Sequence, residues 1–473
     1  MILKPNLFSV DCTLTIMSQR ARLPFAIVGL LLSAQTQAIL PTPESLVTTG
    51  ALAPTLQAAA IANNMPDNAT QEDTQVLKKS NAEQLLAKWR EQAATQNLAQ
   101  HTTWRRLLYF FDDQRNLIGK KKDTSMVDEA DFFLSKNGQY DSAAELDALL
   151  VALADEMATT NNRTVKKSTA NNSVLCRFPA RVQWLTDTLD IDKTALQVDC
   201  PELNEWMQKI APEQLSIMFA QEYLDNPLSA FAHTLLRIDS KASVADPSQI
   251  HHAVALNYTV GGNPKDNFVV YAIKSMTGRY DNLIEIDPYP EKLAKYLQED
   301  ERDAWTYQLD LTPAEVQQIM LHVWETKDLK LPYYFTTDNC ASEILRLIDV
   351  VRPQQHLLSR LPYAVIPSDV VQLLDNEGLL ASTNYTPSDS TLRQSQLNKV
   401  KEQREQLGYH NSAKQTINEI KSAQLNTVSS MSADRQTLLP PTIAVSDNNP
   451  IDRHPLQLAH IGLGQRGDNN YVD

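Results

Sequence analysis

The residue with the clearest chemical potential is a cysteine at the start of a predicted helix. Asp338 or Asn339 can cap this helix, and apolar residues then recur at helical spacing at positions 344, 345, 347, 348 and 351. Unpaired backbone N–H groups and the positive end of the helix dipole lower the pKa of a thiol placed there, and they can also hold an oxyanion. Cys340 is therefore a candidate nucleophile, although an unpaired cysteine is more often a small buried apolar residue.

A thiol nucleophile needs a base and a third group that orients the base. His233 is the candidate base, because it lies on a predicted strand away from the main apolar face of that strand. Asn257, on the small and polar side of the next predicted strand, is the candidate orienting group. Asn339 is expected either to cap the helix or to line the oxyanion site. The histidines that compete with His233 for this role have less suitable surroundings. They lie at a strand start, inside a helix or after the cysteine: His251, His252, His322, His356, His410, His454 and His460.

Strand patterns begin near Leu215 and supply the elements that would hold these side chains. After a short apolar run at 215–220, we expect strands at 230–239, 253–260, 268–274 and 283–286, which would form an antiparallel sheet of at least four strands. The sequence Thr312-Pro313-Ala314-Glu315 is a capping box that opens a further helix. A short link leads from it to the cysteine helix.

The N-terminus has the pattern of an export signal. Arg20 and Arg22 precede an apolar run at 23–32, and small residues follow up to Ala38, where we place the cleavage site. The predicted organisation is a signal peptide at 1–38, a mobile leader at 39–80, a helical region at 81–210, a catalytic domain at 211–383 and a tail at 384–473. The tail is expected to hold a polar helix and a linker and to be largely disordered.

Export makes the cysteine count informative. Removal of the signal takes away Cys12 and leaves Cys176, Cys200 and Cys340 in an oxidising compartment. Cys176 and Cys200 are close in sequence and are expected to pair, which leaves Cys340 as the free thiol.

Charge and motif content exclude several classes of partner. The formal charge of −14 argues against a nucleic-acid partner, because phosphate contacts need clustered Lys and Arg side chains. Neither a His-x-x-x-His pair on a predicted helix nor a Cys-x-x-Cys pair is present, and the aspartates lack calcium-loop spacing. We therefore expect no metal and no other cofactor.

Several motifs together resemble the Lnb N-terminal periplasmic domain family, whose members include lipoprotein intramolecular transacylases. They stand at 231–239, 256–258, 302–309 and 333–340, within a region of about 215–380. Segments at 132–134, 144–146 and 176–181 resemble the helical region that precedes this domain in larger Gram-negative members, and 453–467 resembles the opening of their strand-rich C-terminal domain. One departure is Ala232, where the family usually has glycine before the histidine.

The resemblance implies an α+β fold in which a circularly permuted papain-like (NlpC/P60-like) domain carries His233 ahead of Cys340. It implies a periplasmic cysteine-dependent acyltransferase or hydrolase that acts on lipid-type acyl esters, with a lipoprotein or lipid acyl group as substrate. Peripheral association with the envelope, including the outer membrane, is also expected. The alternatives are a peptidoglycan amidase or endopeptidase and, from another class, a non-catalytic binding or scaffolding module of the envelope.

Overall fold

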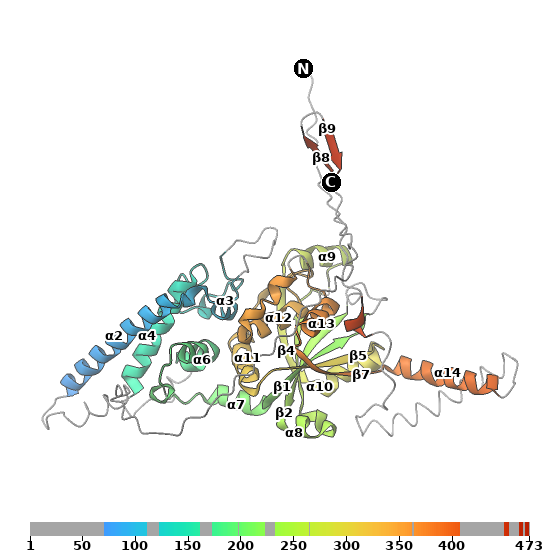
Figure 1. Cartoon of the computed structure of the whole chain (residues 1–473), viewed down its shortest axis with the longest axis horizontal. Coiled ribbons are helices and arrows are strands. Elements are labelled where there is room, and N and C mark those ends of the chain that lie inside the picture. The colour runs from blue at the N-terminus through green and yellow to red at the C-terminus, as the bar shows by residue number, and fades with distance from the viewer. Residues whose placement is uncertain are drawn as a thin grey trace, which may run out of the picture. The chain divides into compact units, whose positions relative to one another are not determined.

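The computed structural model describes residues 71–110, 123–160, 173–196, 198–222, 232–263, 265–361, 364–406, 449–453, 463–466 and 469–472 (Figure 1). The chain divides into one unit at Lys78–Pro455 and a second made of the two ends, Met1–Leu77 and Leu456–Asp473. Within the second unit, β8 (Leu463–Arg466) pairs with β9 (Asn469–Val472) as an antiparallel hairpin. The predicted signal peptide and most of the predicted leader and linker lie outside the described residues.

Helices make up the N-terminal part of the larger unit, which begins within α2 (Gln71–Thr95). The others are α3 (Thr102–Leu107), α4 (Ser142–Thr160), α5 (Val174–Arg177), α6 (Pro179–Thr188) and α7 (Pro201–Ile210), with short turns η1 (Leu98–Gln100), η2 (Ala130–Phe132) and η4 (Lys193–Ala195). The helix α2 begins before the predicted start at Asn81. A disulfide joins Cys176 to Cys200, as predicted, and ties α5 to the start of α7.

The described part of the larger unit contains a seven-stranded antiparallel sheet in the order β6-β4-β3-β2-β1-β5-β7. The strands are β1 (Pro212–Ala220), β2 (His233–Ser240), β3 (Val254–Val260), β4 (Tyr280–Pro288), β5 (Ala304–Leu309), β6 (Leu331–Tyr333) and β7 (Leu380–Thr386). The predicted α+β class and the antiparallel sheet are thus confirmed.

Helices and turns connect and cover these strands. They are α8 (Lys241–Ala245), η5 (Pro247–His252), α9 (Phe268–Met276), α10 (Tyr289–Ala294), the π-helical turn η6 (Lys295–Glu299), α11 (Pro313–Thr326), α12 (Cys340–Val351), η7 (Pro353–Gln355), η8 (Leu358–Arg360), α13 (Pro367–Asn376), α14 (Asp389–Gln406) and η9 (Pro450–Asp452). The predicted capping box of Thr312 and Glu315 opens α11, and the polar helix expected in the tail is α14.

One strand prediction is wrong, because residues 268–274 form the helix α9. A short continuous apolar run has no periodicity that separates a strand from a helix. The cap decides the outcome here: the side chain of Asn267 accepts a hydrogen bond from the backbone N–H of Val270 at 3.0 Å. Tyr271 then packs on Tyr280 of β4 with the ring centroids 5.1 Å apart.

Alternation along the strands builds a core on each face of the sheet. Leu236 of β2 and Leu256 of β3 pack with the side chains of α11, α12 and α13 on one face. Leu235 of β2 and Ala255 of β3 pack with Tyr289 and neighbouring residues on the other. Both faces are therefore covered, which fixes the register of β2 and β3 because a shift by one residue would exchange the two sets.

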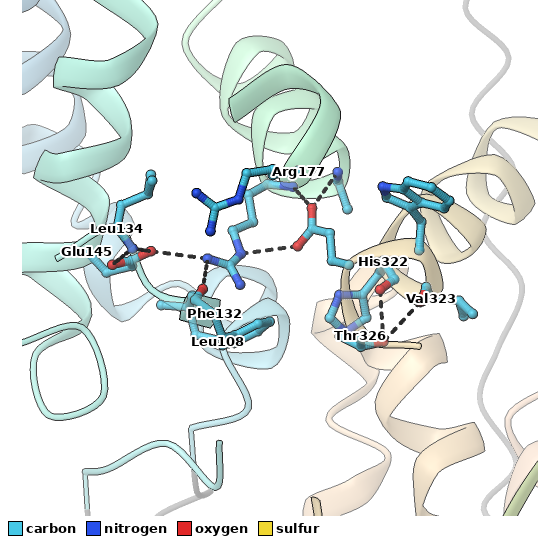
Figure 2. Close-up of polar contacts among 12 residues, drawn as sticks. Leu108, Phe132, Leu134, Glu145, Arg177, His322, Val323 and Thr326 are labelled. Atoms are coloured by element: carbon cyan, nitrogen blue, oxygen red, sulfur yellow. Dashed lines mark hydrogen bonds and ion pairs between the residues drawn. The ribbon is translucent and has the colours of Figure 1, made fainter. Parts of the chain in front are cut away.

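A buried arginine joins the helical part to the sheet domain. Arg181 of α6 donates to the carbonyl oxygen of Phe132 at 2.9 Å and to Glu145 at 3.1 Å, both of the helical part (Figure 2). On its other side it donates to Glu325 of α11 at 3.1 Å, and Glu325 also accepts from the backbone N–H groups of Ala180 and Arg181 at 2.7 and 3.0 Å. Glu325 thus caps the N-terminus of α6 from the neighbouring domain.

The helical part also contacts the helix that carries the cysteine. The hydroxyl of Thr103 on α3 donates to the carbonyl oxygen of Val350 on α12 at 3.0 Å, and Arg106 pairs with Asp349 at 3.3 Å. Both ion-paired side chains are buried. The helical part therefore supports α12 along its second half.

Candidate active site

Asn339 fixes the start of the cysteine helix. Its side-chain oxygen accepts from the N–H groups of Ala341 and Ser342 at 3.0 and 3.2 Å, and its side-chain nitrogen donates to the carbonyl oxygens of Phe335 and Val365 at 2.8 and 2.9 Å. Both hydrogens of the amide are used in these bonds. Of the two roles expected for Asn339, the structure therefore shows the helix cap, and its side chain is not available to an oxyanion.

Cys340 is the first residue of α12, and it is the free cysteine among the described residues. Its side chain is buried and lies within hydrogen-bonding reach of His233. Burial alone would raise the pKa of the thiol, but the charge and hydrogen bond of His233, together with the backbone N–H of Thr234, lower that pKa to about 7. A large share of the thiol is therefore ionised at neutral pH.

His233 opens β2 and connects Cys340 to Asn257. Its Nε2 atom lies 2.7 Å from Oδ1 of Asn257. Burial alone would lower the pKa of His233, but the charge of Cys340 and the hydrogen bonds of Cys340 and Asn257 raise it. The structure thus brings together the three predicted residues Cys340, His233 and Asn257.

The orientation of Asn257 sets the tautomer of the imidazole. Nδ2 of Asn257 donates to Oε2 of Glu285 at 3.2 Å, and Glu285 is paired with Lys292 at 2.8 Å. Because a carboxylate only accepts, the amide nitrogen must face Glu285 and the amide oxygen must face His233. Nε2 of His233 therefore carries a proton, and Nδ1 is left to receive the proton of the thiol.

The site lies where the pairing of β2 with β3 ends. The strands β2 and β3 pair only over Leu236↔Leu256, Arg237↔Ala255 and Ile238↔Val254. His233 and Asn257 lie just beyond this paired stretch, where their side chains bridge the two strands by hydrogen bonding. The N-terminus of α12 reaches the same place, since His233 and Thr234 are close enough to Cys340 to lower the pKa of its thiol.

Tyr296 and Arg302 also belong to the site, and sequence reasoning did not assign them a role. The ring of Tyr296 stacks on His233 with centroids 6.1 Å apart, and the guanidinium of Arg302 lies 5.4 Å from the same ring. Arg302 is held by a hydrogen bond to the carbonyl oxygen of Ala220 at 3.0 Å. The π-helical turn that presents Tyr296 leaves no recognisable pattern in the sequence, although such turns often occur at functional sites.

The residue before the histidine adopts an unusual backbone conformation. Ala232 has φ of 70°, in the left-handed region that glycine occupies without steric cost. This conformation gives a physical reason for a glycine at this position. The methyl group of Ala232 is buried in the core beneath α12. The pair of Cys340 and His233 forms with alanine at this position.

The described residues contain no group of histidine, cysteine, aspartate and glutamate side chains that could hold a metal ion. None of the described helices is both long and apolar enough to cross a bilayer.

The fold and the site define an α+β domain with a cysteine–histidine–asparagine arrangement at a helix start and two strand ends. Residues 202–377 match the Lnb N-terminal periplasmic domain, a family whose description places it in the periplasm. Residues 96–188 match a domain family of unknown function, DUF7843. Searches of curated proteins and of solved structures found no match. The permuted papain-like relationship therefore stays a prediction.

Proposed function

We propose that this protein is a periplasmic acyltransferase or hydrolase that works through a thioester on Cys340. The observation that carries the proposal is the position of His233 between Cys340 and Asn257, with Asn257 in turn oriented by Glu285. Each component of a thiol nucleophile system is present in this chain of contacts. The match of residues 202–377 to a periplasmic domain family supports the compartment, and the export signal predicted at 1–38 would deliver the chain there.

The first half of the reaction forms the thioester. Nδ1 of His233 takes the proton of the thiol, and the sulfur of Cys340 bonds to the carbonyl carbon of the acyl ester. The tetrahedral oxyanion lies at the start of α12, where the backbone N–H of Cys340 and the helix dipole stabilise it. The intermediate collapses when the carbon–oxygen bond breaks and His233 gives its proton to the departing alkoxide.

The second half returns the enzyme to its starting state. Water or an amine attacks the thioester carbon, and Nδ1 of His233 takes a proton from the attacking group. The carbon–sulfur bond breaks and the sulfur leaves as a thiolate. A low pKa of Cys340 favours this departure, because a less basic thiolate is a better leaving group.

The substrate class that we propose is a lipid-type acyl ester, as in the lipoprotein transacylases of the resemblance. The test is to incubate the exported protein with envelope extract, stop the reaction in acid and measure the intact mass. A mass increase of one fatty acyl group, located on Cys340 by peptide analysis, is the expected result. The matched variant Cys340→Ser retains the other contacts and should not form a thioester.

Two other results would replace the proposal. A cell-wall peptide attached to Cys340 would assign the domain to peptidoglycan cleavage. No adduct, together with alkylation of the thiol that rises only near an ordinary pKa of about 8.5, would indicate a non-catalytic module.

A further inference from the structure

The helix α9 exposes an apolar face that the described part of the protein does not cover. Val269, Ile273 and Met276 retain 63%, 57% and 59% of their exposure to solvent. Their spacing of four and three residues places them on one side of the helix. Large apolar side chains gathered on an exposed surface often mark an interaction site.

The opposite side of α9 is firmly attached to the domain. Tyr271 packs against Tyr280, and Ser275 is buried. The exposed face is therefore a feature of a well-anchored helix rather than of a loosely held segment. Among the side chains of α9 that the structure describes, those that face outward are aliphatic or thioether groups. Neither type forms strong hydrogen bonds that would direct it to a polar partner.

The end of α9 touches the segment that leads to Cys340. The carbonyl oxygen of Ser275 accepts a hydrogen bond from the N–H of Phe335 at 2.9 Å, and the ring of Tyr334 fills the space where a Cβ atom of Gly278 would lie. Phe335 in turn accepts from the capping residue Asn339 at 2.8 Å. The end of α9 is thus joined, through Phe335, to the residue that caps the cysteine helix.

Charged residues at both ends of α9 favour a negatively charged surface. Lys265 and Arg279 are exposed before and after the helix. Lys274 is paired with Asp266 at 2.7 Å, so these two charges offset each other. Exposed Asp281 is the nearest acidic residue after Arg279. The local balance is therefore slightly positive, in contrast to the formal charge of −14 for the whole chain.

We infer that α9 docks the domain on a lipid bilayer. Val269, Ile273 and Met276 enter the boundary between headgroups and acyl chains, while Lys265 and Arg279 lie near anionic headgroups. Short amphipathic helices with basic flanks bind membrane surfaces in this way. The inference rests on the proposed function in one respect, since the bilayer is the source from which acyl esters would reach Cys340.

The test is sedimentation of the full chain with vesicles of phosphatidylethanolamine and phosphatidylglycerol. The parent is Cys340→Ser, so that binding is measured without chemistry. Replacing all three exposed side chains, in Val269→Gln/Ile273→Gln/Met276→Gln, should weaken binding roughly a hundredfold, because about half of their exposed apolar area leaves water on insertion. The matched control is Val244→Gln on α8, which is 44% exposed and lies outside α9. It should bind like the parent.

Charge reversal tests the second part of the inference. Lys265→Glu/Arg279→Glu should weaken binding to vesicles that contain phosphatidylglycerol by at least about thirtyfold. Each basic residue near an anionic surface is worth about 1 kcal/mol, so the loss of two corresponds to about 2 kcal/mol. The same variant should bind neutral phosphatidylcholine vesicles like the parent. Equal thermal melting of all variants shows that the differences do not arise from unfolding.

Three results would overturn the inference. In the first, the parent does not sediment with vesicles. In the second, the triple variant binds vesicles like the parent. In the third, the parent self-associates through α9, and the triple substitution abolishes this self-association without changing vesicle binding. Turnover of a water-soluble short-chain thioester by the protein with Cys340 intact separates the two proposals. If α9 docks on the bilayer but the proposed function is wrong, the protein binds vesicles and does not turn over the thioester. If the proposed function is right but α9 does not dock, the protein turns over the thioester, and the triple substitution changes neither turnover nor vesicle binding.

Discussion

Replacing His233 by alanine should raise the pKa of Cys340 from about 7 to above its ordinary value. His233 supplies the charge and hydrogen bond that oppose the burial of the thiol. Without them, burial remains and disfavours the thiolate. A change from about 7 to about 9 corresponds to roughly 2.7 kcal/mol of lost thiolate stabilisation.

The ionised fraction at pH 7 would fall from about one half to about one hundredth, a change of roughly fiftyfold. A more basic thiolate is intrinsically more nucleophilic, by about eightfold for this difference in pKa. The alkylation rate at pH 7 should therefore fall only about sixfold. The midpoint of the rate against pH is the more decisive observable.

The assay is iodoacetamide alkylation of Cys340 in the folded protein over a range of pH. For the unaltered protein, the rate should increase as pH rises through about 7, because the thiolate is the reactive form. In His233→Ala, the same increase should occur near pH 9 or above. The exposed residue His251 provides a matched control, and His251→Ala should keep the midpoint near 7. A His233→Ala midpoint that stays near 7 would refute the assignment of His233 as the charge partner.

Asn257→Ala should lower turnover at least tenfold, because the imidazole of His233 loses the hydrogen bond that fixes its tautomer. Cys340 should still form a mass adduct in this variant, and unchanged turnover would contradict the orienting role of Asn257. Ala232→Gly should keep activity and raise the free energy of unfolding by up to about 1 kcal/mol, since glycine removes the cost of the left-handed backbone. Denaturant unfolding measures this free energy, and a clear decrease would contradict the prediction. Arg181→Met should destabilise the protein by about 3–5 kcal/mol, because it leaves the buried carboxylates of Glu145 and Glu325 without a counter-charge. A melting temperature within a degree or two of that of the unaltered protein would disprove this.

Local signals carried much of the prediction. The capping box at Thr312 and the cysteine helix could be placed because capping and helical spacing are encoded within a few residues. Alternation along β2 and β3 correctly separated His233 and Asn257 from the core beneath α12. The pairing of Cys176 with Cys200 could be predicted because the two cysteines are close in sequence and the chain was expected in an oxidising compartment.

The remainder depends on contacts between distant parts of the chain. The apolar run at 268–274 suits both strand and helix, and its cap and its packing on Tyr280 decide between them. Tyr296 reaches His233 from a π-helical turn, and Glu285 reaches Asn257 from the neighbouring strand β4. Such neighbours are set by strand order and connection geometry, which the local sequence does not specify.

The central claim is that Cys340 becomes acylated with the help of His233. The most direct measurement is the intact mass of the purified protein after acid-stopped incubation with envelope lipids, compared with His233→Ala and Cys340→Ser. We expect a fatty acyl increment on Cys340 of the unaltered protein, a strongly reduced increment in His233→Ala and no thioester in Cys340→Ser. An unmodified Cys340 under all conditions, or an equal yield in His233→Ala, would contradict it.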